Sequence, residues 1–290
     1  NGGKFTKTFK CHPKQELNRV DTDTCLDRES LKVLVREWNK RNEYKMRISN
    51  MDDGKIMKQM IENLTKCKDD MCILDKIPDS NIKTNMKKTI YAPEAPNSWK
   101  KNKNEWLTNL DINNVMKQYE EAYSNFKFLG VTPIDFDSKR SNTCITPEIC
   151  NFDISDYIDK TKINKFGIVF NTDPHTSGGS HWISMFIDLD RKIIFFFDSA
   201  GNEIPNEIKK LVKRIQKSYK NYFNYNYNKL QKLEYLTNGD FQHQKTNTEC
   251  GMYCLYFLIN LIKETRKLED FKNELIRDDV VEQYRKIYFN

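Results

Sequence analysis

Two apolar runs in the second half of the chain constrain its fold more than any other feature. Residues 181–188 and 192–198 are rich in β-branched and aromatic side chains, and a short polar turn at 189–191 separates them. This pattern predicts two buried strands joined as an antiparallel hairpin. A residue that begins the first strand and one that ends the second then reach the same edge of the sheet. His181 and Asp198 occupy these positions, so we expect a hydrogen bond between them.

A third apolar run predicts a buried helix. Residues 250–262 have the length of a helix and contain no breaker after Gly251, so the helix is expected to begin at Cys250. A thiol at a helix N-terminus faces unpaired backbone N–H groups and the positive end of the helix dipole. Both favour the thiolate, the form in which a cysteine acts as a nucleophile.

Together these residues have the composition of a cysteine-hydrolase triad, in the order His181, Asp198, Cys250. Such a triad needs a thiolate nucleophile, an imidazole that holds and transfers its proton, and a carboxylate that orients the imidazole. Gln244 lies six residues before Cys250, and its amide is predicted to help the Cys250 backbone N–H bind the oxyanion of a tetrahedral intermediate. Asn247 is the second candidate for that role.

The same residues form an ordered motif that resembles a known family. The family is the ubiquitin-like-protein (SUMO) proteases with their viral relatives, which include adenain and the polyprotein-processing proteases of large DNA viruses. The resemblance covers roughly residues 90 to 255. The motif consists of three blocks, His181-Trp182, Asp198-Ser-Ala-Gly201 and Gln244-Lys-Thr-Asn-Thr-Glu-Cys250-Gly251.

The resemblance implies an α+β fold with a mixed central β-sheet flanked by helices, as in the papain-like and adenain-like proteases, and a mechanism without metal or organic cofactor. It implies that Trp182 roofs a narrow tunnel, with Asn247 and Gly251 also facing substrate. Glycine alone lets a backbone pass between flat walls without a Cβ clash. The implied substrates are therefore proteins or polyproteins with Gly-Gly-x or small-Gly-x sites, matured in the host-cell cytoplasm and the virion. This chain departs from one viral branch of the family at Asp198, where that branch carries an amide side chain.

The first hundred residues predict a separate helical region. Apolar residues recur at helical spacing over 29–41 and 55–66, which indicates two amphipathic helices. Residues 76–104 contain prolines and many polar residues without a clear period, and they are interpreted as a linker. We therefore predict an N-terminal helical domain over 1–100 and a catalytic domain over 101–290, with Asp111 capping the first catalytic helix.

The cysteines suggest neither disulfides nor a metal site. They stand at positions 11, 25, 67, 72, 144, 150, 250 and 254, which is no compact disulfide framework. We expect them to stay reduced, as in a reducing compartment. The pairs at 67/72 and 144/150 are spaced widely for zinc, and the remaining histidines complete no tetrahedral set.

Charge and hydropathy leave other functions open. The net charge is +7, and Glu207 is the single acid between Pro205 and Lys232, so a basic helix over 205–220 is a candidate site for DNA or an acidic partner. A solvated lysine-rich face is the plainer interpretation. No stretch approaches the length of a membrane span. The alternatives are a deSUMOylating or deubiquitinating isopeptidase, an acyltransferase with the same site, and a basic nucleic-acid or scaffold-binding module without catalysis.

Overall fold

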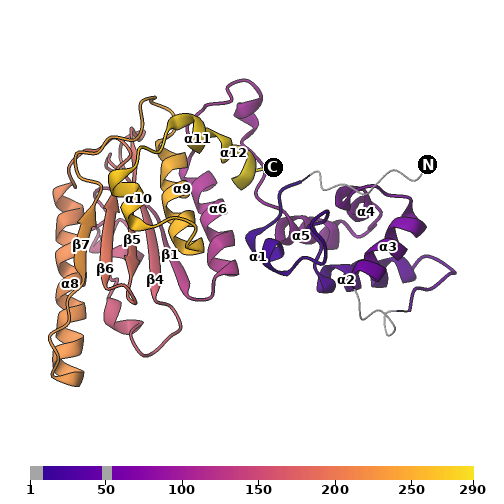
Figure 1. Cartoon of the computed structure of the whole chain (residues 1–290), viewed down its shortest axis with the longest axis horizontal. Coiled ribbons are helices and arrows are strands. Elements are labelled where there is room, and N and C mark those ends of the chain that lie inside the picture. Colours follow the sequence, from indigo (N-terminus) through magenta and orange to yellow (C-terminus); the bar gives the residue numbers. More distant parts are fainter. Residues whose placement is uncertain (1–8, 48–53) are drawn as a thin grey trace. The chain divides into compact units, whose positions relative to one another are not determined.

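The computed structural model describes residues 9–47 and 54–290. These residues form two compact units. The N-terminal unit comprises the chain up to Ala95 together with residues 286–290. The second unit comprises residues 96–285 and is called the catalytic unit because it contains the predicted catalytic residues. Figure 1 shows the first as a group of helices and the second as a sheet with helices. The return of the last five residues to the N-terminal unit has no signal in the sequence; there the Asn290 backbone N–H donates to the Pro93 carbonyl.

The N-terminal unit is built from short helices around its own core. The helices are α1 (Pro13–Asn18), α2 (Arg28–Asn39), α3 (Gly54–Thr65), α4 (Asp70–Asp75) and α5 (Ser80–Ile90). The two amphipathic helices predicted from spacing are α2 and α3, and both are confirmed. Their apolar faces are buried in the core of this unit, which includes Leu31, Val35, Met57 and Ile61.

The interpretation of residues 76–104 as a linker is wrong over its first half. Asp79 caps α5 by accepting hydrogen bonds from the backbone of Asn81 and Ile82, and Met86 and Ile90 are buried in the core. The helix escapes notice in the sequence because it is short, buries few side chains and lies between prolines. Tertiary contacts stabilise such a segment more than its own propensity does.

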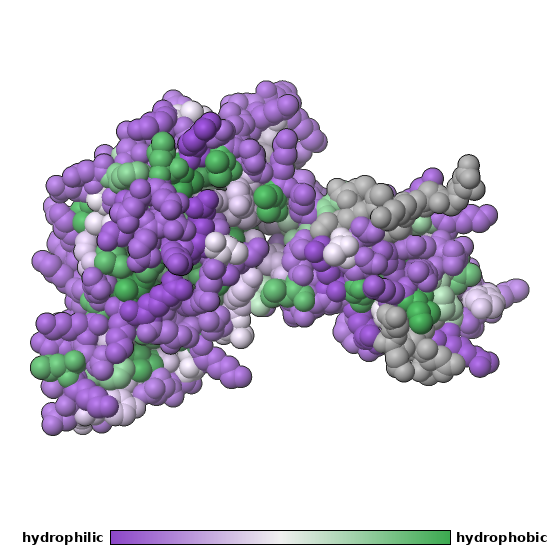
Figure 2. All heavy atoms as spheres, in the orientation of Figure 1, coloured by the Kyte–Doolittle hydropathy of each residue, from purple (hydrophilic) through white to green (hydrophobic). Residues whose placement is uncertain are grey.

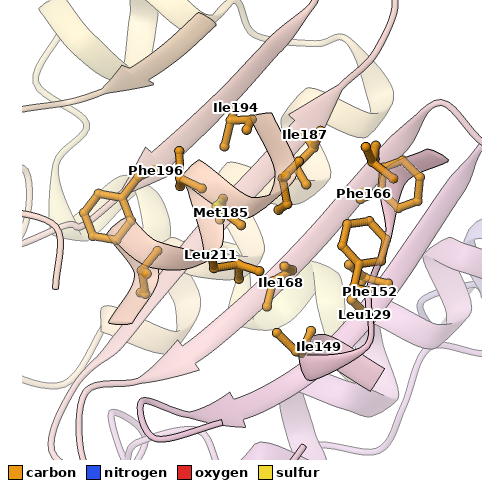
Figure 3. Packing of buried hydrophobic residues seen from close by; sticks show 14 of the residues in the cluster. Leu129, Ile149, Phe152, Phe166, Ile168, Met185, Ile187, Ile194, Phe196 and Leu211 are labelled. Atoms are coloured by element: carbon orange, nitrogen blue, oxygen red, sulfur yellow. The ribbon is translucent and has the colours of Figure 1, made fainter. Parts of the chain in front are cut away.

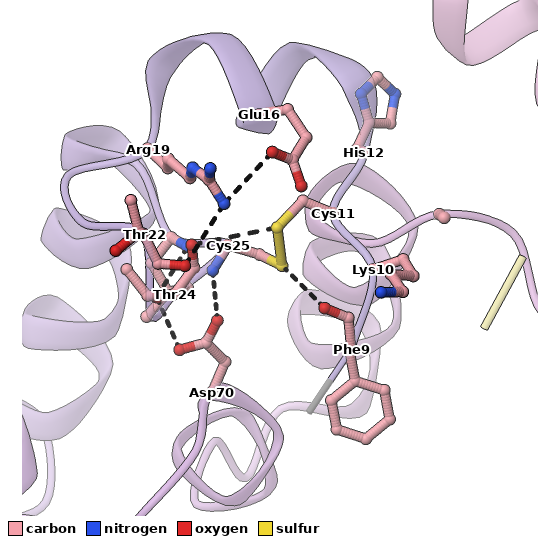
Figure 4. Close-up of a disulfide and its surroundings, with 12 residues drawn as sticks. Phe9, Lys10, Cys11, His12, Glu16, Arg19, Thr22, Thr24, Cys25 and Asp70 are labelled. Atoms are coloured by element: carbon pink, nitrogen blue, oxygen red, sulfur yellow. Dashed lines mark hydrogen bonds and ion pairs between the residues drawn. A yellow bond between two sulfur atoms is a disulfide. The ribbon is translucent and has the colours of Figure 1, made fainter. Parts of the chain in front are cut away.

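The expectation that the cysteines stay unpaired is also wrong. Disulfides join Cys11 to Cys25, Cys67 to Cys72 and Cys144 to Cys150, and leave Cys250 and Cys254 free. The first bridge closes the loop around α1, as Figure 4 shows. Beside it, the buried Asp70 carboxylate accepts hydrogen bonds from the Cys25 backbone N–H at 2.6 Å and from the Thr24 hydroxyl at 2.7 Å. Pairing depends on which loops fold together, and cysteine spacing alone does not reveal that.

The catalytic unit contains a five-stranded sheet in the order β1-β4-β5-β6-β7. Its strands are β1 (Phe126–Pro133), β4 (Lys165–Asn171), β5 (Trp182–Asp188), β6 (Ile193–Phe197) and β7 (Glu234–Thr237). The β4/β5 and β5/β6 pairs are antiparallel, whereas β1/β4 and β6/β7 are parallel. The predicted hairpin is β5/β6. With the helices around it, this mixed sheet confirms the predicted α+β fold class.

Helices bury both faces of the sheet, which explains why its central strands are mostly apolar instead of alternating between apolar and polar residues. Alternate residues of a strand point to opposite faces. On one face, Phe196 packs with α8 (Asn206–Tyr227) in the cluster of Figure 3. On the other, Phe195 and Phe197 contact Phe257 of α9 (Cys250–Lys263) at ring-centroid distances of 5.2 and 4.6 Å. The strand β6, which leads to Asp198, is therefore packed on both faces.

Smaller elements complete the catalytic unit. The helix α6 (Asn109–Ala122) begins one turn before the predicted cap: Thr108 is the N-cap and Asp111 is the N3 residue of a capping box. The others are the 3-10 turns η2 (Asn97–Lys100) and η3 (Ile154–Asp156), the two-stranded β2/β3 (Lys139–Arg140, Thr143–Cys144), α7 (Pro147–Cys150), α10 (Leu268–Asn273) and α11 (Asp278–Gln283); α12 (Arg285–Tyr288) crosses into the N-terminal unit.

The basic helix is α8, and its inner face is apolar as predicted, with Ile208 and Leu211 fully buried. Two of its cations are paired: Arg214 lies 2.8 Å from Asp137, and Lys209 lies 3.8 Å from Glu203. In the view of Figure 2, hydrophilic side chains cover most of the catalytic unit's surface. A DNA or acidic partner at residues 205–220 stays a prediction. Within the described ranges, no helix is both long and apolar enough to span a membrane.

Candidate active site

The β5/β6 hairpin brings His181 and Asp198 together. His181 immediately precedes β5 and Asp198 immediately follows β6, and the antiparallel register pairs Ser184 with Phe197. The His181 Nε2 atom lies 2.6 Å from Asp198 Oδ1. The strand ends thus supply the hydrogen bond that the hairpin pattern predicts.

Cys250 completes the cluster from the first residue of α9. It lies close enough to His181 to act on the pKa of that ring, and because Nε2 is bound to Asp198, Nδ1 is the ring nitrogen left for the sulfur. Burial by itself lowers the pKa of His181, but hydrogen bonds and charges from Asp198 and Cys250 outweigh it and raise that pKa to about 10. The arrangement therefore favours an imidazolium between a carboxylate and a sulfur.

The raised pKa of His181 predicts how the stability of the fold depends on pH. A pKa that is higher in the folded state than the unfolded value of about 6.5 stabilises the fold fully below that value. This contribution is lost as pH rises through the folded value of about 10. We expect the difference in unfolding free energy between the wild type and His181→Gln to be largest near pH 6 and to shrink toward pH 10. Urea unfolding across this range checks the prediction, and a difference independent of pH would contradict it.

Asparagines that the sequence interpretation missed hold Asp198 in place. The buried Asn238 accepts a hydrogen bond from the Asp198 backbone N–H at 3.1 Å and donates to its carbonyl at 2.7 Å. The Asp198 carboxylate also accepts from Asn202 Nδ2 at 3.0 Å and from the Ala200 backbone N–H at 2.8 Å. Gly201 follows with φ +75°, and a Cβ there would lie 3.0 Å from the Gln242 backbone nitrogen. The Asp-Ser-x-Gly motif is thus a turn that packs against the loop leading to Cys250.

Gln244 is bound into this turn and not free in the site. Its Oε1 accepts from the Ser199 hydroxyl at 2.7 Å, and its Nε2 donates to the Thr246 carbonyl at 2.7 Å. A side-chain amide has a second N–H hydrogen, which remains for an oxyanion. Asn247 is exposed in the loop before α9. The oxyanion roles of both residues stay predictions.

Trp182 forms part of a groove of about 510 Å³. Its indole N–H donates to the Leu107 carbonyl at 2.9 Å. Gly251 packs behind it, because a Cβ at Gly251 would lie 3.0 Å from Leu107 Cβ and 3.2 Å from Trp182 Cδ1. Gly178 and Gly179 line the same groove. The groove is thus lined by Trp182, the residue that follows His181. Leu107 holds the Trp182 ring in this wall, and no sequence pattern indicates that role.

One known protein family matches the second part of the chain. Residues 165–290 match the Ulp1 protease family, C-terminal catalytic domain. The matched segment includes β5, β6 and α9, and therefore every residue of the His181–Asp198–Cys250 cluster.

Similar proteins occur in two large viruses. A thiol protease of Acanthamoeba polyphaga mimivirus is 27% identical over 82% of this chain and 75% of its own length. A cysteine protease of African swine fever virus is 25% identical over 79% of this chain and 88% of its own length. A crystal structure of a protease from African swine fever virus superposes with a TM-score of 0.65 at 19% identity, covering 97% of this chain and 95% of that one. At this identity the superposition shows a shared fold.

Proposed function

Because this chain is a cysteine protease of the Ulp1 family, we propose that it is an endopeptidase that cleaves after Gly-Gly-x or small-Gly-x sequences. The observation that carries the proposal is the hydrogen bond between His181 and Asp198 with Cys250 beside the imidazole. Trp182, the next residue after His181, lines the groove. Protease family membership implies protein substrates. Because similar proteins occur in large viruses, we propose that its substrates are structural polyproteins matured during virus assembly. We place this activity in the host-cell cytoplasm and the virion as part of the same proposal.

In the proposed reaction, the Cys250 thiolate attacks the scissile carbonyl carbon and forms a thioester as the C–N bond breaks. The His181 imidazolium gives its proton to the leaving amine. Neutral His181 then takes a proton from water, which attacks the thioester, releases the carboxylic acid and regenerates the thiolate. Asp198 keeps the ring oriented throughout. The Cys250 backbone N–H and the second N–H of Gln244 stabilise the oxyanion in both steps.

Preference for glycine follows from the rigidity of the wall beside His181. The Trp182 ring is held by its bond to the Leu107 carbonyl and by contact with Gly251. A substrate backbone passing this wall gains room when it carries no Cβ. The resemblance to the SUMO proteases supports the same preference.

The proposal is tested by mass spectrometry of peptide cleavage. Peptides containing Gly-Gly-Ala, Ala-Gly-Ala or Ala-Ala-Ala are incubated with the wild type and with Cys250→Ala. We expect the wild type alone to cleave the first two. Equal cleavage of Ala-Ala-Ala would contradict the glycine preference, and cleavage by Cys250→Ala would contradict the mechanism.

A second candidate is removal of ubiquitin-like proteins from their conjugates. It is favoured by a relative in African swine fever virus, 24% identical over 79% of this chain, that bears the name SUMO-1 cysteine protease. Folded ubiquitin-like fusions included in the same experiment separate the two. Cleavage of the fusions without cleavage of short peptides would favour this second function.

The groove allows a matched pair of glycine variants. Gly179 has φ +86°, and a Cβ there would lie 2.6 Å from Asn171 Nδ2, whereas a Cβ at Gly178 would meet no atom within 4 Å. A non-glycine residue in such a conformation costs of order 1–3 kcal/mol, and the turn that lines the groove must shift to relieve that cost. Because the shift would displace the groove wall, we expect Gly179→Ala to lower kcat/KM for the Gly-Gly peptide by about tenfold or more. Gly178→Ala should stay within about threefold of the wild type, and equal losses in both variants would contradict this account.

A further inference from the structure

Behind the nucleophile lies a buried ion pair that the reaction described above does not use. Arg285 and Glu249 are 5% and 2% exposed. The Arg285 Nε atom donates to Glu249 Oε2 at 3.0 Å, and one terminal nitrogen donates to Oε1 at 2.9 Å. This is the bidentate pairing for which a guanidinium is shaped and a lysine ammonium is not.

On one side, this pair controls the first turn of α9. Glu249 is the N-cap residue of the helix and directly precedes Cys250. Its backbone carbonyl accepts the hydrogen bond from the Tyr253 N–H at 2.8 Å. The Arg285 guanidinium also donates to the Thr248 carbonyl, at 3.4 Å. The Arg285 side chain therefore binds both residues that directly precede Cys250, Thr248 and Glu249.

On the other side, the same guanidinium holds the segment that forms a wall of the groove. Its second terminal nitrogen donates to the Glu105 carbonyl at 2.9 Å, and its carbon lies 4.5 Å from the centre of the Trp99 ring. Two residues beyond Glu105 is Leu107, which accepts the Trp182 indole N–H and packs against Gly251. Arg285 thus contacts both the segment that precedes Cys250 and the segment that precedes Leu107.

We propose that Arg285 is a positioning residue, which holds the start of α9 against segment 99–107 and so fixes Cys250 relative to His181 and Trp182. The proposal rests on the proposed function in taking Cys250 as the nucleophile. Misplacing a reacting group by about 1 Å costs up to about 100-fold in rate. Loss of the guanidinium fork should therefore lower the reactivity of the sulfur without greatly changing substrate affinity.

The test compares Arg285→Lys and Glu249→Gln with a matched control, Arg266→Lys. Arg266 contacts the same helix away from the site: its Nε donates to the Tyr256 hydroxyl at 2.6 Å, and its guanidinium carbon lies 5.6 Å from that ring's centre. Three quantities are measured in each variant: the rate of Cys250 alkylation by iodoacetamide, located by mass spectrometry; kcat and KM for the Gly-Gly peptide; and the Tm.

We expect Arg285→Lys to lower both the alkylation rate and kcat by about 10- to 100-fold while KM changes by less than about threefold, and Arg266→Lys to change neither rate.

A lower Tm with unchanged alkylation and kcat would overturn the proposal. If Arg285→Lys does not fold, Glu249→Gln, which keeps the shape of the side chain, decides the question. Failure of both to fold while Arg266→Lys folds would also overturn it, because the pair would then serve the fold alone. Alkylation needs no substrate, so the comparison remains decisive if the wild type cleaves none of the peptides and the proposed function fails.

Discussion

We expect Cys250→Ala to abolish peptide cleavage, with kcat falling by about 10⁵- to 10⁶-fold. The sulfur is the atom that forms the thioester, and an alanine methyl group has no lone pair to attack with. The fold should survive, because Cys250 is a buried helical residue and alanine has the highest helix propensity. We expect a loss of about 1 kcal/mol in unfolding free energy. The measurements are single-turnover cleavage of the Gly-Gly peptide and thermal unfolding.

The chain supplies its own control for this substitution. Cys254 is the second free cysteine and lies one turn further along α9, fully buried. Burial raises the pKa of its thiol well above the ordinary value, so it stays protonated and inert. Cys254→Ala should keep kcat within about threefold of the wild type and lose a similar amount of stability. Equal loss of activity in both variants would show that the effect comes from packing and not from the nucleophile.

The second large effect is expected at Asp198. Asp198→Ala should lower kcat by about 10³- to 10⁴-fold, because His181 loses the acceptor that orients its ring and stabilises its positive charge. Asp198→Asn should lose less than the alanine variant, because an amide oxygen still accepts a hydrogen bond from Nε2 at the observed 2.6 Å separation. Steady-state kinetics on the Gly-Gly peptide rank the three proteins.

Asp188 is the matched control at the opposite end of the same hairpin. It is 1% exposed, like the buried Asp198, and its carboxylate accepts hydrogen bonds from the backbone N–H groups of Asp190 and Arg191 at 3.0 Å each. Asp188→Ala should therefore reduce stability and leave kcat near the wild-type value. A comparable loss of kcat at Asp188 would mean that the hairpin as a whole, and not the carboxylate beside His181, limits the reaction.

The parts of the site that could be predicted are those that depend on local pattern. Continuous apolar runs and their lengths indicate the hairpin and the helix α9, and these elements carry His181, Asp198 and Cys250 at or next to their ends. The enzyme class was likewise predicted from the spacing of these residues, and it is confirmed. Local pattern suffices here because a strand or helix that is buried throughout needs a continuous apolar run.

The parts that escaped prediction depend on contacts between residues far apart in the chain. Arg285 binds Glu249, 36 positions earlier, and the Glu105 carbonyl, 180 positions earlier. Trp182 is fixed by a backbone carbonyl, which any residue at position 107 would supply. The disulfides are more local, since Cys11 pairs with Cys25 across α1 and the other two bridges close loops of five and six residues, but cysteine spacing alone does not show which loops bring two sulfur atoms together.

The disulfides and the nucleophile make opposite demands on their surroundings. Cys250 reacts only while its sulfur is reduced, whereas thiol reductants open disulfides by exchange, and the Cys144–Cys150 bridge belongs to the catalytic unit itself. We therefore expect cleavage activity to pass through a maximum as dithiothreitol is raised, with the decline accompanied by an increase in titratable thiols. A plateau that persists after every bridge has opened would contradict this. Full activity is thus expected only over a range of redox potential: oxidation of Cys250 sets one limit, and reduction of the disulfides sets the other.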